Sequence, residues 1–208
     1  MFITFEGADG VGKTTQMELL RERLEAQGQE VLLTREPGGS PIAEKIRGLL
    51  LDRENDMDDM TEAYLYAAAR ADHVRRVILP ALARGCVVLC DRYVDSSLAY
   101  QGFGREIGAQ AVWEINRQAV GRCMPYRTYL MALGRQEAER RVRARGEMDR
   151  MESAGRAFAQ RVDEGFALLA QRAPERIMVL DAAQTKEVLA RLIAEDVAKL
   201  KTCPPDGR

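Results

Sequence analysis

Residues 7–14 read GADGVGKT, a complete GxxxxGK[ST] phosphate-binding loop. A short β-prone run precedes this loop, and a helical pattern follows it. The glycines let backbone N–H groups turn inward around phosphate oxygens, and the helix N-terminus adds partial positive charge. In such a loop Lys13 reaches the β- and γ-phosphates, and the Thr14 hydroxyl ligates Mg²⁺. The segment predicts a nucleoside triphosphate site formed by Gly7, Ala8, Asp9, Gly10, Val11, Gly12, Lys13, Thr14 and Thr15.

Two other motifs are expected at the end of strands. Residues 87–93 read VVLCDRY, so an apolar strand delivers Asp91 at its tip, where a Mg²⁺ site beside a phosphate-binding loop needs a carboxylate. Arg92 follows, and its fork of donors could hold a phosphate. Residues 35–39, REPGG, follow another expected strand, although an ordinary polar turn would explain them equally well. Carboxyl ends of parallel strands share one edge of a sheet, where ligands bind.

Two further groups of residues lie on expected helices. Tyr66 and Arg70 are four residues apart, so an aromatic ring and a guanidinium share one helical face and could stack on a nucleobase and bond its edge. A partly buried tyrosine beside a surface arginine is the simpler alternative. Arg143, Arg145 and Arg150 surround Gly146, which should break a helix and place arginines on a lid over the transferring phosphoryl group.

The elements that must position these residues alternate along the chain. Strands are expected at 2–5, 30–34, 87–90, 128–132 and 177–180, and helices at 15–27, 61–83, 109–120, 136–145, 155–171 and 185–200. This alternation predicts an α/β fold with a parallel sheet covered on both faces. We expect one domain over residues 1–200, with a lid at about 143–153, and a disordered tail over 201–208.

The composition limits the possible partners. The chain has 208 residues, 46% of them hydrophobic, with 31 basic against 32 acidic residues, so charge gives no case for a nucleic-acid or membrane partner. No apolar run approaches the roughly 20 residues that span a bilayer, and no leader pattern precedes the first strand. Cys86, Cys90, Cys123 and Cys203 form no CxxC pair, and Cys86 and Cys90 flank an apolar run, so both are expected to be small buried hydrophobic residues. His73, the only histidine, is expected to be solvated or at the core edge. These features favour a cytoplasmic protein.

Taken together, the motifs resemble the thymidylate kinase (dTMP kinase) family. They are GADGVGKTT, LTREPGGS, AAAR, DRYVDSSLAYQG and RARGEMDRME, in the family's order and spacing over nearly the whole chain. The arginine-rich last motif is similar to the bacterial form, in which the catalytic arginine comes from the lid; the other form carries it in the phosphate-binding loop, where this chain has Gly10. The resemblance implies a P-loop kinase of the nucleoside-monophosphate type with a five-stranded parallel sheet. It also implies phosphoryl transfer from Mg·ATP to dTMP, giving ADP and dTDP.

The resemblance also assigns roles to residues. Asp91 would support the metal with Thr14, while Tyr66 would stack on thymine, Arg70 would bond its exocyclic oxygen, and Tyr100 would disfavour a ribose 2′-hydroxyl. The expected catalytic residues are Lys13, Arg92, Arg143, Arg145 and Arg150. The expected acceptor-binding residues are Asp9, Glu36, Tyr66, Arg70, Arg92, Ser97, Tyr100 and Gln101.

Other interpretations of the sequence remain open. A kinase for another nucleotide or nucleoside would carry the same phosphate machinery, and acceptor profiling would separate it. A P-loop switch of the small GTPase type needs an NKxD segment, which this sequence lacks. The resemblance implies a homodimer, with the Ala- and Val-rich face of the helix at 61–83 as a plausible seam.

Overall fold

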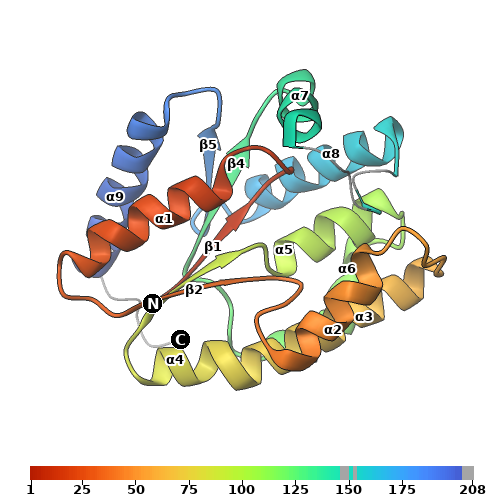
Figure 1. Cartoon of the computed structure of the whole chain (residues 1–208), viewed down its shortest axis with the longest axis horizontal. Coiled ribbons are helices and arrows are strands. Elements are labelled where there is room, and N and C mark those ends of the chain that lie inside the picture. The colour runs from red at the N-terminus through yellow and green to blue at the C-terminus, as the bar shows by residue number, and fades with distance from the viewer. Residues whose placement is uncertain (146–149, 152–153, 203–208) are drawn as a thin grey trace.

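Five parallel strands form one sheet in the computed structural model (Figure 1). The structure describes residues 1–145, 150–151 and 154–202, without the side chains of residues 139, 142–145, 201 and 202. The strand order is β2-β3-β1-β4-β5, which confirms the expected fold class. The strands are β1 (Phe2–Glu6), β2 (Val31–Arg35), β3 (Val87–Asp91), β4 (Arg127–Ala132) and β5 (Ile177–Asp181).

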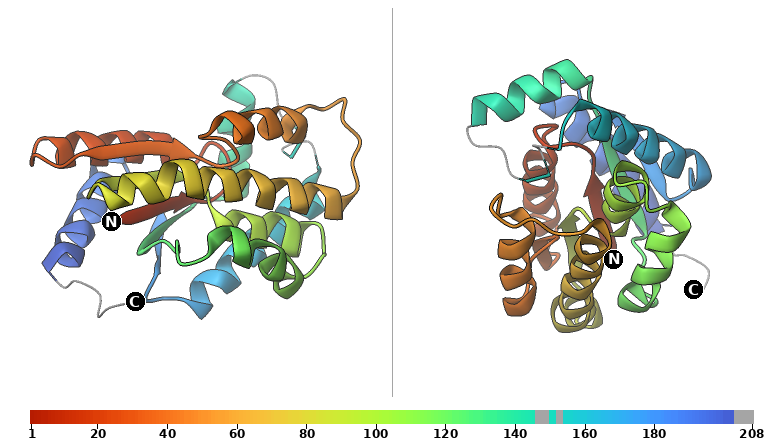
Figure 2. Two further views of the ribbon diagram at one scale, coloured as in Figure 1. Left: turned by 90° about the horizontal axis from the view of Figure 1, so that it is seen from below. Right: turned by 90° about the vertical axis from the view of Figure 1, so that its right-hand side faces the viewer.

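Helices cover both faces of this sheet. Figure 1 places α1 and α9 on one face, and α4 and α6 on the other, and the two views of Figure 2 show the same layering. The helices are α1 (Lys13–Glu25), α2 (Pro41–Leu51), α3 (Asp59–His73), α4 (Leu79–Ala83), α5 (Val94–Ser97), α6 (Ala109–Val120), α7 (Arg135–Arg145), α8 (Arg156–Arg172) and α9 (Lys186–Thr202), with π-helical segments η1 (Val74–Ile78) and η2 (Leu98–Gly104). In the part of the chain that is described, no helix is both long enough and apolar enough to cross a bilayer.

Each strand supplies side chains to two cores. Ile3 and Phe5 pack in a cluster with α1 and α9, whereas Phe2 belongs to a cluster with η1 and the loop after α6. Leu89 and Cys90 of β3 divide in the same way. Successive side chains of a strand point to opposite faces, so both must be apolar when both faces are covered. The strands are therefore mostly apolar, and the buried hydroxyls of Thr4 and Thr128 form a hydrogen bond with each other.

Some elements differ from the prediction. Helix α2 was not expected, although Ser40 caps it by accepting a hydrogen bond from the Ala43 N–H and Pro41 stands in its first turn. The segment after β3, where no helix was expected, is helical and forms α5 and η2. The expected helix at 61–83 has the right extent but includes the π-helical η1.

The Ala- and Val-rich residues of this long helix are divided between the interior and the surface. Ala63, Ala67, Ala69 and Val74 are buried within the chain, where α3 packs against α2 and α6. Ala68 is exposed, so the seam stays a prediction for the outer side of the helix.

The expected lid and tail fall partly outside the described residues. Helix α7 ends at Arg145, so Arg143 and Arg145 belong to its last turn and not to a loop, while Gly146 is outside the described residues. Helix α9 continues to Thr202, two residues into the expected tail, and residues 203–208 are outside the described part.

Two helical glycines allow a matched test of the packing. A Cβ at Gly165 on α8 would lie 2.7 Å from the Phe103 ring of η2, whereas a Cβ at Gly48 on α2 would meet nothing within 4 Å. We expect Gly165→Ala to lower the free energy of unfolding by about 1–3 kcal/mol through overpacking. Gly48→Ala should raise it by roughly 0.5–1 kcal/mol, because alanine restricts the unfolded chain. Urea denaturation of both variants checks this, and equal shifts would contradict it.

Candidate active site

The loop between β1 and α1 has a backbone that requires glycine. Gly7 has φ +124°, and a Cβ there would lie 2.4 Å from the Met131 carbonyl oxygen of β4. Gly12, with φ +96°, precedes the first residue of α1, which is Lys13. This geometry aims the first N–H groups of α1 and the loop at one point, as a phosphate site needs.

Lys13 is held at the centre of this loop. Its Nζ donates to the Ala8 carbonyl at 3.0 Å and lies 3.8 Å from Asp91 Oδ1. Burial lowers the pKa of Lys13, and the positive charge of Arg92 adds to this effect, while Asp91 and Asp9 oppose it. The nearest carboxylate oxygens are 3.8 Å (Asp91) and 3.9 Å (Asp9) from the ammonium, so an anionic ligand at hydrogen-bond distance would stabilise its charged form further.

Thr14 and Asp91 meet beside Lys13. The Thr14 hydroxyl donates to Asp91 Oδ2 at 3.4 Å, and Asp91 Oδ1 is buried without a hydrogen-bond partner in the described part of the chain. A hydroxyl and a carboxylate with a spare oxygen fit Mg²⁺. Among the described residues, no cluster of three or more His, Cys, Asp and Glu could hold a metal. An ion here would therefore need phosphate oxygens and water as its other ligands.

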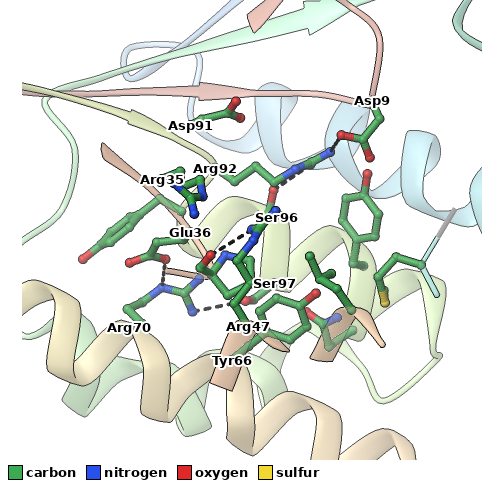
Figure 3. Close-up of a pocket in the computed structure, with 16 residues that line it drawn as sticks. Asp9, Arg35, Glu36, Arg47, Tyr66, Arg70, Asp91, Arg92, Ser96 and Ser97 are labelled. Carbon is green, nitrogen blue, oxygen red and sulfur yellow. Dashed lines mark hydrogen bonds and ion pairs between the residues drawn. The ribbon is translucent and has the colours of Figure 1, made fainter. Parts of the chain in front are cut away.

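Arg92 connects the phosphate-binding loop to the neighbouring cavity. Its Nη2 lies 3.0 Å from Asp9 Oδ1, and its Nη1 donates to Ser96 Oγ at 3.1 Å (Figure 3). Burial works against its charge, but the carboxylates of Asp9, Asp91 and Glu6 keep the pKa of Arg92 above its ordinary value. The backbone of Arg92 has φ +68°, an uncommon value for this residue type that places the guanidinium at the cavity wall.

The cavity beside Arg92 brings together the expected acceptor-binding residues. Tyr66 and Arg70 come from α3, as Figure 3 shows, and line the cavity together with Ser97. The expected residues that line it are Asp9, Glu36, Tyr66, Arg70, Asp91, Arg92, Ser97, Tyr100 and Gln101. The sequence motifs therefore converge on one site.

Arg70 forms the floor of the cavity and is almost fully buried. Its Nε donates to Glu36 Oε2 at 2.8 Å, its Nη1 donates to Ser97 Oγ at 3.1 Å, and Asn116 Oδ1 accepts another bond. The alternative of a partly buried tyrosine beside a surface arginine is therefore wrong for Arg70, while Tyr66 is partly buried.

Arg150 is not among the residues that line the cavity, although the next residue, Met151, is. The Nη2 of Arg150 is 2.5 Å from Glu62 Oε2 and its Nε donates to the Leu50 carbonyl at 2.9 Å. Glu62 is fully buried and also accepts from Gln101 and Arg105. The side chains of Arg143 and Arg145 are outside the described part of the chain.

Several residues of this site were missed from the sequence. Arg35, Arg47 and Ser96 line the cavity, and Glu6 and Glu62 are buried beside it. Arg35 and Glu6 each end a strand at the ligand-binding edge, which could have indicated them. Nothing in the sequence distinguishes Glu62 from the exposed acids of other helices.

The prediction for His73 is wrong. The ring is fully buried, with Nδ1 3.0 Å from Glu36 Oε1 and Nε2 2.7 Å from Thr34 Oγ1. Its spacing of three residues from Arg70 puts both on one face of α3, a signal that could have placed it beside the site. The prediction of buried cysteines is confirmed for Cys86 and Cys90, which carry free thiols.

Comparisons with known proteins agree with this geometry. The family model described as Thymidylate kinase matches residues 5–193. The thymidylate kinase of Exiguobacterium sibiricum is 50% identical over 197 residues, covering 94% of this chain and 93% of that protein. The thymidylate kinase of Citrifermentans bemidjiense is 45% identical, covering 93% of this chain and 89% of that protein.

A solved structure has the same fold over nearly the full length. The crystal structure of thymidylate kinase from Ehrlichia chaffeensis matches with a TM-score of 0.74 and 32% identity, covering 98% of both chains. The chain belongs to the thymidylate kinase family. It phosphorylates dTMP to dTDP with ATP as the donor, and neither a kinase for another nucleotide nor a non-catalytic switch is favoured.

Glu6 supports Arg92 through Ser96. The Tyr93 N–H donates to Glu6 Oε1 at 2.8 Å, and Ser96, which accepts from Arg92, donates to Glu6 Oε2 at 2.5 Å. Burial, with the nearby charge of Asp95, raises the pKa of Glu6 to about 8. The folded protein therefore holds a proton that the unfolded chain releases at its ordinary pKa of 4.5.

This proton makes stability depend on pH. Between about pH 5 and pH 8 the folded state binds more protons, so stability falls as pH rises. We expect Glu6→Gln, which keeps both hydrogen-bond positions, to flatten the dependence of the unfolding free energy on pH over this range. Glu22→Gln, on the exposed side of α1, should leave it unchanged. Urea denaturation across the range checks this, and an unaltered slope in Glu6→Gln would contradict it.

Proposed function

We propose that the described site performs in-line transfer of the γ-phosphoryl group of Mg·ATP to the phosphate of dTMP. The observation that carries the proposal is the Arg92–Asp9 pair, at 3.0 Å, which joins the phosphate-binding loop to the cavity floored by Arg70. Because the donor site and the acceptor site meet at the Arg92 guanidinium, the phosphoryl group could pass directly from one bound nucleotide to the other. The attacking group is already a phosphate oxygen, so positioning and charge stabilisation suffice and no strong base is required.

The donor side uses the loop and the start of α1. Lys13 neutralises the β- and γ-phosphates, and Thr14 and Asp91 hold Mg²⁺ together with phosphate oxygens and water. Bound magnesium supplies Lewis-acid neutralisation of the phosphates. The residues proposed at ATP are Gly7, Ala8, Asp9, Gly10, Val11, Gly12, Lys13, Thr14 and Thr15.

The acceptor side uses the cavity walls. Arg92 holds the phosphate of dTMP, the Tyr66 ring stacks on thymine, and Arg70 donates to an exocyclic oxygen. Tyr100 packs against C2′ of the sugar. The centroid of its ring is 5.0 Å from Cζ of Arg92, which supports a place for Tyr100 beside the bound phosphate. Asp9, Glu36, Ser97 and Gln101 complete the set, with Asp9 at the sugar 3′-hydroxyl or phosphate.

The charge that develops in transfer needs a further cation. The phosphate-binding loop has Gly10 at the position from which a side chain could reach the transferring phosphoryl group. We therefore assign this role to Arg143, Arg145 and Arg150, in a lid at about 143–153. The lid belongs to the single domain proposed over residues 1–200. To take this role, the Arg150 guanidinium has to leave the Glu62 carboxylate and bind phosphate oxygens instead.

The protein is proposed to act as a homodimer in the cytoplasm, with no nucleic-acid or membrane partner. Met60 and Tyr64 on α3 are exposed large side chains, which supports a two-fold interface along this helix. Free thiols at Cys86, Cys90 and Cys123 suit a reducing compartment.

The central test is dTMP-dependent turnover of ATP. We expect ADP formation to rise strongly when dTMP is added with Mg²⁺, and Lys13→Ala to lower kcat on the order of 10²-fold or more while the fold stays intact. Lys45→Ala, an exposed lysine on α2, should keep full activity. A coupled ADP assay measures all three. Turnover that does not respond to dTMP, or that survives in Lys13→Ala, would refute the proposal.

A second test concerns the lid arginines. Replacing Arg143, Arg145 and Arg150 together with alanine should lower kcat by at least about 10²-fold, with a much smaller change in dTMP binding. Arg23, Arg84 and Arg172 are exposed and lie outside the cavity, so their triple alanine variant is the matched control. Full kcat in the lid variant would refute the proposal that these arginines stabilise the charge of the transition state.

A further inference from the structure

We propose that His73 is a positioning residue for dTMP binding, which acts by fixing the Glu36 carboxylate that orients Arg70. This inference rests on the proposed role of Arg70 at the base. His73 has no route to the substrate itself, because its ring is fully buried behind Glu36.

The contacts form one continuous chain toward the cavity. Thr34 Oγ1 lies 2.7 Å from His73 Nε2, and His73 Nδ1 lies 3.0 Å from Glu36 Oε1. The other oxygen, Glu36 Oε2, accepts from Arg70 Nε at 2.8 Å (Figure 3). Each oxygen of Glu36 therefore has its own donor, and the carboxylate cannot turn without breaking one of the two bonds.

The chemistry of the partners fixes the ring. An ionised carboxylate only accepts, so Nδ1 must carry a hydrogen and donate to Glu36. Nε2 faces a hydroxyl, which can donate to a bare nitrogen or accept from a protonated one. The bond from Nδ1 to Glu36 therefore exists in both charge states of the imidazole, and Thr34 adapts to either.

The backbone around the ring leaves no space for it to move. A Cβ at Gly39, where φ is +82°, would lie 2.4 Å from His73 Nε2 and 2.6 Å from Thr34 Oγ1. The loop after β2 thus closes over the ring at a position that only glycine can take. Because the loop holds the imidazole ring in place, the hydrogen bond from the ring also holds the Glu36 carboxylate in one orientation.

The orientation matters because Arg70 has to present a donor to the cavity. Its Nε is committed to Glu36 and its Nη1 to Ser97 and Asn116, so these partners set the plane of the guanidinium. Without His73, Glu36 Oε1 would be buried and unpaired, and the carboxylate would rotate to seek another donor. Arg70 would then bind the base in several orientations, which weakens binding without touching the phosphate chemistry.

Two amide variants separate this role from simple packing. Asn places a donor near the position of Nδ1 and can still bond Glu36, whereas Gln extends to the position of Nε2 and reaches only Thr34. We expect His73→Gln to raise the KM and the Kd for dTMP about tenfold, as the loss of one charge-assisted bond does. His73→Asn should recover much of this loss, while kcat and the KM for ATP stay within about twofold for both. Thr34→Val removes only the hydrogen-bond partner of Nε2. It should raise the Kd for dTMP less than His73→Gln does.

Steady-state kinetics, calorimetric titration of dTMP and thermal unfolding of the purified full chain are the measurements. Unchanged dTMP binding in His73→Gln would overturn the inference. Loss of dTMP and ATP binding together, in step with a lower Tm, would also overturn it, because the residue would then be structural only. Arg70→Lys serves as the reference: if it leaves dTMP binding intact, the proposed acceptor site fails as well. If it weakens dTMP binding and the His73 variants do not, only the positioning role fails.

Discussion

The ion pair between Arg92 and Asp9 is the contact on which the rest of the site depends. Arg92 follows β3 and Asp9 belongs to the loop after β1, so the pair fixes the ends of two neighbouring strands relative to each other. Ser96 and Glu6 hold the guanidinium from the other side. The pair is only partly buried, with exposed fractions of 16% for the Arg92 side chain and 30% for that of Asp9, so its role is to set geometry and it adds little stability. It keeps the phosphate-binding loop and the neighbouring cavity in one arrangement.

Ion pairs also position side chains around the cavity that we propose for the acceptor. Arg70 is paired with Glu36, and Glu62 is shared by Arg105 and Arg150, with each carboxylate almost wholly buried. These pairs add little stability over apolar packing, because desolvation offsets most of the attraction. Their benefit is a preformed arrangement of donors, which lowers the ordering that substrate binding would otherwise require.

The sequence predicted the fold and the motifs well because both are local patterns. Continuous apolar strands and a glycine loop at the end of the first one specify a parallel sheet and its ligand edge, and β1 and β3 lie where expected. The pairing partners could not be predicted in this way. Arg150 and Glu62 are 88 residues apart, and Glu6 and Ser96 are 90 apart, so no spacing rule connects them. His73 was misassigned for the same reason, since burial of a lone histidine depends on the loop that closes over it.

The partners of Glu62 bear on the proposed movement of Arg150 to the transferring phosphoryl group. A buried carboxylate that lost its only cation would be costly, and that cost would hold the arginine in place. Glu62 instead keeps Arg105, whose Nη2 lies 3.0 Å from Oε2, and Gln101, whose Nε2 donates to Oε1 at 2.8 Å. Departure of Arg150 therefore leaves the carboxylate with a cation and a hydrogen-bond donor. Because Gln101 also lines the cavity, Glu62 would still position a side chain of the proposed acceptor site after Arg150 had moved.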